Sequence, residues 1–146
     1  MKLGRRPLAA LLAAGCLTLL MAGTAACGGS PTRLITVKAG QGAGPVELEV
    51  SNQTDVAINN LYLAPSGKVG PELDPDSPEG REVWGADLLK NAIPAGSRVP
   101  IATVAPGRWD ARVLDRDGRY QHVTGLKLEG NGRYILELND SGWRVR

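Results

Sequence analysis

Hydrophobic and polar residues alternate along most of the chain after residue 32, in short runs that turn residues separate. In the clearest run, Val46, Leu48 and Val50 share one face, and Glu47 and Glu49 share the other. Period-two alternation is typical of a β-strand with one face in water. We predict strands over residues 33–38, 46–50, 55–64, 97–104, 109–113, 120–129 and 133–138, with a short last strand at 143–146.

Two local features, a phase change at residues 59–60 and a proline at residue 100, refine this strand pattern. Val56 and Ile58 share one phase, whereas Leu61 and Leu63 share the opposite phase. A β-bulge between the two pairs, at residues 59–60, would absorb one residue and return both pairs to the core. Pro100 lies inside the run 97–104 and has no N–H to donate, so that strand is expected at a sheet edge.

Seven or eight short strands with regular turns predict an all-β fold: a single β-sandwich, Ig-like or small barrel-like, over residues 33–146. The chain has three Trp, three Tyr and no Phe, so its core must be built mainly from Val, Leu and Ile. Residues 65–83 are rich in proline and glycine and predict a long surface loop. Residues 84–91 predict one helical turn before Pro94, and the Gly40–Gly44 run predicts a flexible turn.

The first 26 residues differ from the rest of the chain. Lys2, Arg5 and Arg6 precede the apolar run Leu8–Ala22. A basic start, an apolar centre and small residues at the end are the three parts of an export signal. The apolar run has 15 residues, fewer than the ~20 that a membrane-spanning helix needs. We therefore expect an N-terminal signal helix over residues 1–26.

The run Met21–Cys27, followed by two glycines and a serine, resembles the lipobox of bacterial lipoproteins. The resemblance implies cleavage before Cys27, lipidation of its sulfur and a flexible tether over residues 27–32. Two alternatives stay open: a plain secretory signal cleaved near residues 24–26, and a retained membrane anchor. Cys16 also follows small residues, but lipidation there would leave an apolar core of only Leu8–Ala14.

Charge and cysteine content exclude several classes of function. Three of the 17 basic residues and none of the 15 acidic residues precede Cys27, so the part from Cys27 onward has a formal net charge of −1. A near-neutral domain does not indicate a nucleic-acid partner. Both cysteines lie at or before residue 27. A domain whose Cys27 is lipidated has no thiol for catalysis or metal binding and no disulfide.

Four short motifs together resemble a family of small secreted bacterial domains. This family has no established biochemical activity, and the present chain has a longer loop after Pro65. The resemblance covers residues 55–140 and rests on Ile58–Ser66, Trp84–Leu89, Ile93–Gly96 and Trp109–Gly118.

The acidic residues give weak candidates for a metal site. Asp74, Asp76 and Glu79 lie close together, and oxygen ligands at such spacing can hold Ca²⁺. The twelve-residue calcium-loop pattern is absent, so a solvated acidic loop is the alternative. Asp110 should point outward beside Arg112, where it could form an ion pair.

The sequence contains no set of residues that predicts catalysis. His122 is the only histidine and is expected on the surface or beside a turn. No nucleophile motif accompanies it. We therefore expect a non-enzymatic protein without a cofactor.

Trp84 has the strongest claim to a special role, because it stands beside Gly85 and Asp87, outside the predicted strands. It either plugs one end of the sandwich or is exposed for recognition. Asp87 would cap the helical turn or bind loop backbone. Tyr62 lies nearby on a predicted strand and belongs, by alternation, to the core or its edge. Trp84, Asp87 and Tyr62 form the candidate binding surface, within residues 65–89.

The expected function combines these features. The chain is predicted to be a lipid-anchored, extracytoplasmic protein of the bacterial cell envelope, which binds a protein or another envelope component. The alternatives are a carrier of calcium or a small ligand and, less favoured, a hydrolase.

Overall fold

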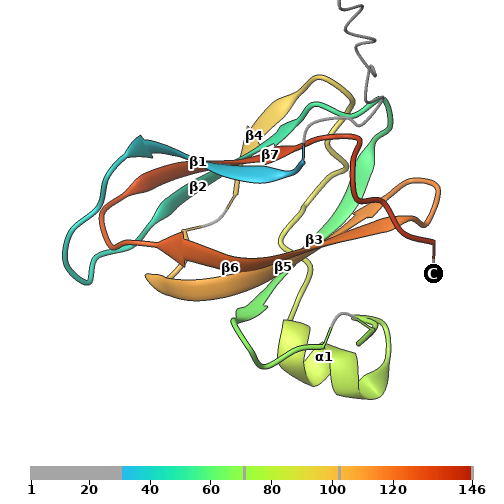
Figure 1. The fold of residues 1–146 in the computed structure, drawn as a ribbon, viewed down its shortest axis with the longest axis horizontal. Coiled ribbons are helices and arrows are strands. Elements are labelled where there is room, and N and C mark those ends of the chain that lie inside the picture. The colour runs from blue at the N-terminus through green and yellow to red at the C-terminus, as the bar shows by residue number, and fades with distance from the viewer. Residues whose placement is uncertain (1–30, 71, 102, 146) are drawn as a thin grey trace, which may run out of the picture.

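The computed structural model describes residues 31–70, 72–101 and 103–145, which form two β-sheets and one short helix (Figure 1). Cys27 and the export signal lie outside the described residues. No helix in the described part of the chain is long and apolar enough to cross a membrane. The elements in chain order are β1 Arg33–Lys38, β2 Glu47–Asn52, β3 Ile58–Pro65, α1 Pro78–Trp84, β4 Arg98–Pro100, β5 Gly107–Asp115, β6 Tyr120–Leu128 and β7 Arg133–Leu138.

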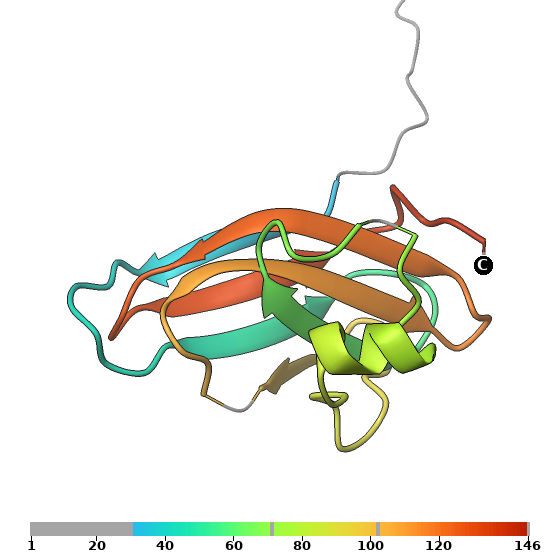
Figure 2. The same ribbon diagram turned by 90° about the horizontal axis from the view of Figure 1, so that it is seen from below.

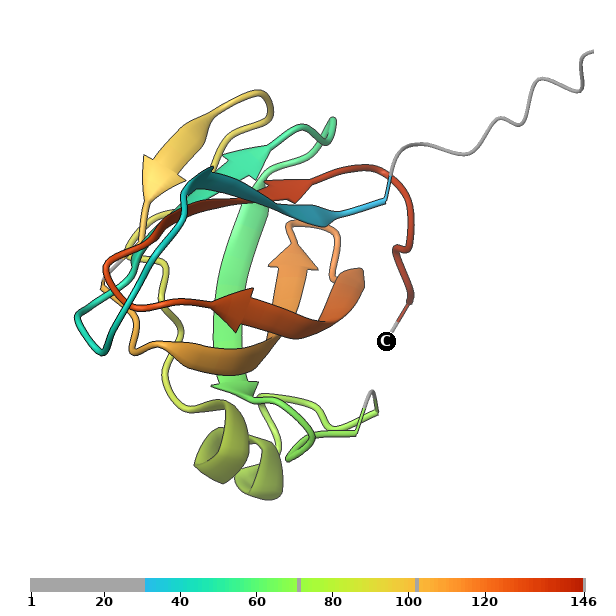
Figure 3. The same ribbon diagram turned by 60° about the vertical axis from the view of Figure 1, so that its left-hand side comes forward.

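The two sheets stack as layers, and the prediction of an all-β sandwich is confirmed (Figure 3). One sheet has four strands in the order β1-β7-β2-β4, and the other has three in the order β3-β5-β6. β2 and β7 pair in parallel, whereas the other pairs are antiparallel. β4 is an edge strand, as Pro100 predicted.

The main core lies between the two sheets and is built from alternate residues of the strands. β2 contributes Val46 just before its start, then Leu48 and Val50, and all three are almost completely buried. Each fully buried aliphatic side chain stabilises the fold by about 1.5–3 kcal/mol. The neighbouring strand β7 adds Tyr134, Leu136 and Leu138 from the same sheet, and the residues that face them from the other sheet include Leu61, Leu63, Ala111 and Val113.

The predicted bulge in the third strand is present. Ile58 pairs with Asp115, and Asn60 pairs with the adjacent Leu114, so one residue of β3 has no partner in register. The extra residue restores the phase, and both Ile58 and Leu61 point into the core.

The helix lies earlier in the chain than the sequence analysis predicted. It spans Pro78–Trp84, within the predicted loop 65–83, and residues 85–91 form no regular element. The Ser77 hydroxyl accepts a hydrogen bond from the Gly80 N–H (2.9 Å), and Pro78 occupies the first turn. Gly85 ends the helix with a positive φ of 73°. These are common helix start and stop signals.

Two predicted strands are shorter than expected. The run 97–104 forms strand only over β4, Arg98–Pro100. The predicted strand at 143–146 is an isolated bridge between Tyr120 and Arg144. That bridge covers only the first residue of β6.

The glycine-rich loop before β2, which was predicted to be a flexible turn, packs tightly against the turn before β7. A Cβ at Gly130 would lie 2.2 Å from the carbonyl oxygen of Gly42. The side-chain amide of Asn131 also donates a hydrogen bond to the Gln41 carbonyl (2.8 Å). Backbone therefore packs directly on backbone here, which only glycine allows.

Gly130→Ala should lower the free energy of unfolding by about 1–3 kcal/mol, because two loop backbones must separate to admit the methyl group. Denaturant unfolding of the full chain in detergent measures this change. Gly70→Ala is the control, because no atom lies within 4 Å of a Cβ at Gly70. Its effect should stay within about 0.5 kcal/mol, and equal effects of both variants would contradict the packing described.

Candidate functional site

Three ionisable side chains lie together on the outer face of the three-stranded sheet. Successive side chains of a strand point to opposite faces, so Asp110 and Arg112 of β5 and His122 of β6 point away from the main core. Asp110 is only 3% exposed and Arg112 only 2%. Something other than the second sheet must therefore cover this face.

The cover is the chain between β3 and Gly85. We call residues 66–70 and 72–85 the cover segment. It includes α1, which lies across the outer face of the three-stranded sheet (Figure 2). A second apolar cluster fills the space between them. It comprises Tyr62, Ala64, Val69, Trp84, Leu114 and Tyr120, with Leu73 and Val83 packed at its margin.

Trp84 is the largest side chain of this cluster. It is 2% exposed, and its indole N–H donates to the Leu73 carbonyl (3.0 Å). It plugs the outer face of the sheet and not an end of the sandwich. Tyr62 is 8% exposed on the same face. Neither side chain offers the accessible surface that the predicted binding site requires.

Asp87 binds loop backbone, one of its two predicted roles, and it caps no helix. One carboxylate oxygen accepts hydrogen bonds from the N–H groups of Leu61 (2.9 Å) and Leu89 (3.0 Å). The other accepts from the side-chain amide of Asn60 (2.8 Å). The Leu88 N–H donates to the Leu61 carbonyl (2.9 Å). Asp87 thus seals the outer edge of β3 beside its bulge.

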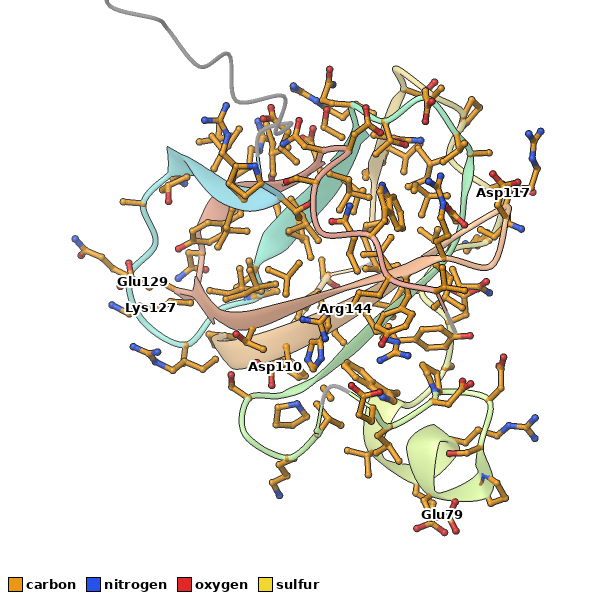
Figure 4. The ribbon with its side chains drawn as sticks, turned by 45° about the vertical axis from the view of Figure 1, so that its right-hand side comes forward. Glu79, Asp110, Asp117, Lys127, Glu129 and Arg144 are labelled. Carbon is orange, nitrogen blue, oxygen red and sulfur yellow. The ribbon has the colours of Figure 1, made fainter. Side chains whose placement is uncertain are left out.

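Asp110 fastens the start of the cover segment to the sheet (Figure 4). It accepts hydrogen bonds from the Ser66 hydroxyl, the Gly67 N–H (3.2 Å) and the Gly125 N–H (2.8 Å). Burial by itself raises the pKa of Asp110, but these hydrogen bonds outweigh burial and hold its pKa below the ordinary value. Its hydrogen bond to Ser66 was not visible in the sequence.

Arg112 lies beside an aromatic ring and opposite the histidine. Its guanidinium carbon is 3.6 Å from the centroid of the Tyr120 ring, a cation–π arrangement. In the register of β5 and β6, Arg112 pairs with His122.

His122 was expected on the surface or beside a turn. It is instead half-buried against Trp84. The two rings meet edge to face, with centroids 5.5 Å apart. Both imidazole nitrogens are buried, and neither has a hydrogen-bond partner among the described residues. Burial lowers the pKa of His122, the charges of Arg112 and Arg144 lower it further, and Asp110 opposes them. The pKa lies below its ordinary value, so the neutral form prevails at pH 7.

The weak metal candidates do not come together. One carboxylate oxygen of Asp74 accepts from the Asp76 N–H (2.9 Å), which closes a local turn before α1. Glu79 lies in the first turn of α1 and is exposed. Among residues 31–70, 72–101 and 103–145, no three His, Cys, Asp or Glu side chains gather closely enough to hold a metal ion.

The described domain begins with two residues that are held in place. The Asn139 side-chain amide donates to the Pro31 carbonyl (3.1 Å), and the Thr32 hydroxyl donates to the side-chain carbonyl of Gln121. Pro31 and Thr32, the last two residues of the predicted tether, are therefore hydrogen-bonded to the folded domain. The four Cα–Cα steps from Cys27 to Pro31 can span at most about 14 Å.

Two surface grooves were not predicted from the sequence. One, of about 340 Å³, lies between residues 88–92 and residues 99–101. The other, of about 330 Å³, lies between Pro31 and Thr32, residues 121–124, and Ser141 and Gly142. His122 lines the second groove, but its nitrogens are buried. A ligand in that groove would not reach them.

Comparison with known proteins identifies no relative. The sequence matches no protein-family model, no curated protein and no solved structure. The resemblance to small secreted bacterial domains therefore stays a prediction.

Asp87→Ala should lower the free energy of unfolding by about 1–3 kcal/mol, because the Leu61 N–H at the bulge loses its acceptor. Denaturant unfolding measures the loss. Asp140→Ala is the matched control, since Asp140 is exposed and its removal should change stability by less than about 0.5 kcal/mol. A neutral Asp87→Ala variant would show that the edge of β3 does not need this carboxylate.

Proposed function

We propose that this chain is a lipid-anchored module of the bacterial cell envelope, which binds a protein or another envelope component without catalysing a reaction. The position of Cys27 carries the proposal. It stands four residues before Pro31, whose carbonyl is hydrogen-bonded into the folded domain. Lipid on that sulfur would hold the domain close to the membrane surface.

The state of the ionisable residues supports a non-enzymatic role. A catalytic base must reach the proton that it removes from a substrate. The nitrogens of His122 are buried, and the carboxylate of Asp110 already accepts three hydrogen bonds from Ser66, Gly67 and Gly125. Both side chains serve the attachment of the cover segment.

The solvent side of the cover segment is the surface that we assign to partner binding. It replaces the predicted trio Trp84, Asp87 and Tyr62, which pack or form hydrogen bonds within the domain. The first strand, β1, belongs to the four-stranded sheet, whereas α1 packs on the outer face of the three-stranded sheet (Figure 3). A domain held through Cys27 would therefore present α1 away from its anchor. The exposed charged residues there are Lys68, Glu72, Asp76, Glu79, Arg81 and Glu82.

Cys27→Ser should abolish incorporation of a labelled fatty acid and move the protein from the membrane fraction to the soluble fraction, because no other acceptor sulfur follows the signal. Cys16→Ser is the matched control and should remain lipidated and membrane-bound. A Cys27→Ser protein that fractionates like the parent, or a Cys16→Ser protein that loses its label, would refute the anchor.

A photo-crosslinking residue at Glu79 should yield a discrete adduct in living cells, because Glu79 is exposed on α1. The same residue placed at exposed Arg98, on the edge strand β4, should not yield that adduct. Gel mobility and mass spectrometry of the purified adduct provide the readout. The same adduct at both positions, or none at Glu79, would contradict binding through the cover segment.

A further inference from the structure

The surroundings of His122 suit its neutral form and oppose its protonated form. Four groups face the imidazole: Trp84 from α1, Asp110 and Arg112 from β5, and Arg144 from the segment after β7. A protonated imidazole carries two N–H donors, and each needs an acceptor when buried. No hydrogen-bond partner lies at either nitrogen in the described part of the chain.

Protonation would also place a second positive charge beside Arg112. The two residues pair in register on adjacent strands, and Arg112 is only 2% exposed. Water cannot screen two cations at such a site as it does on a surface. Trp84 packs edge to face on the imidazole ring, so movement or hydration of the imidazole would disturb the contact that holds Trp84.

Among the described residues, Asp110 is the anion that acts on His122, and it also holds the start of the cover segment. Its carboxylate already accepts from Ser66, Gly67 and Gly125. An attraction of protonated His122 to this carboxylate would compete with the hydrogen bonds from the Ser66 hydroxyl and the Gly67 N–H. Those two bonds hold the start of the cover segment. Burial and the charges of Arg112 and Arg144 therefore favour opening when His122 is protonated, and the attraction of Asp110 partly offsets them.

We propose that protonation of His122 releases the cover segment from the outer face of the three-stranded sheet, while the core between the sheets stays intact. Release would expose Tyr62, Leu114 and Tyr120, which the cover segment now buries. This release on protonation depends on the fold alone and does not rest on the lipid anchor. It would make this face of the domain respond to the acidity of its compartment.

The direction of the pH effect follows from the linkage between protonation and opening. The closed state lowers the pKa of His122 below its ordinary value of 6.5, so the open state binds the proton more tightly. The closed cover is therefore favoured above about pH 6.5 and loses stability as the pH falls from there toward the lowered pKa. Within that window the ratio of open to closed molecules rises by up to about tenfold per pH unit.

Amide hydrogen exchange of the full chain in detergent tests the proposal, after correction for the intrinsic effect of pH. Between pH 7 and pH 5, protection of residues 72–85 should fall by up to about tenfold per pH unit, while protection of β7 stays constant. In His122→Phe, which keeps an aromatic ring against Trp84 but cannot be protonated, protection of the cover segment should not change with pH. Constant protection in the parent, an equal fall in His122→Phe, or a parallel fall in β7 would each overturn the proposal.

A second measurement covers the case in which the variant does not fold. The chain has one histidine, so its imidazole proton resonance can be followed by NMR without ambiguity. Its titration should coincide in pH with the loss of protection in the cover segment. A His122 that titrates near pH 6.5 while the cover segment stays protected would refute the coupling.

Discussion

The three-stranded sheet carries apolar residues that must be buried on both of its faces, and the rest of the architecture follows from that constraint. Leu61 and Leu63 of β3 face the sandwich core, whereas Tyr62 and Ala64 of the same strand face outward and are buried as well. A sheet in water needs a cover wherever its face is apolar. The four-stranded sheet covers one side, so the long connection after β3 must cover the other.

Trp84 explains how such a short helix can provide this cover. A helix of seven residues, Pro78–Trp84, is unstable by itself, since isolated helices below about 12–15 residues are marginal in water. A buried Trp removes about 150–250 Å² from water, which contributes roughly 4–6 kcal/mol before entropic costs. Packing on the sheet, more than helix propensity, therefore holds α1 in place. Asp110 and Arg112 are buried on the same face, and His122 is half-buried there.

The sequence predicts the strands well, because their period-two alternation is a local property. The alternation of Val46–Val50 located the core face of β2, and the phase change between Ile58 and Leu61 located the bulge in β3. The helix signals were also local: Ser77 before Pro78, and Gly85 at the end. They were missed because the segment has no helical hydrophobic period, and its single large apolar anchor is Trp84.

The environment of the candidate site could not be read in the same way. Alternation indicates that Asp110, Arg112 and His122 point away from the main core, and such residues usually meet water. Their burial depends on the cover segment above them, which is 37–56 residues away in sequence from His122. Hydrogen bonds such as Ser66 to Asp110 join distant segments without a periodic signal. The strands were therefore predictable, whereas the buried polar cluster was not.

The cover segment and β1 belong to different layers of this small domain. Pro31 and Thr32 before β1 are hydrogen-bonded to Asn139, after β7, and to Gln121 of β6. The cover segment is held in place by hydrogen bonds to Asp110, by the packing of Trp84 and by the contacts of Asp87 with the edge of β3. It can change its attachment without disturbing the core residues between the sheets. A buried histidine placed at that attachment, and not in the core, is where a proton has the largest effect on the exposed face at the smallest cost to the fold.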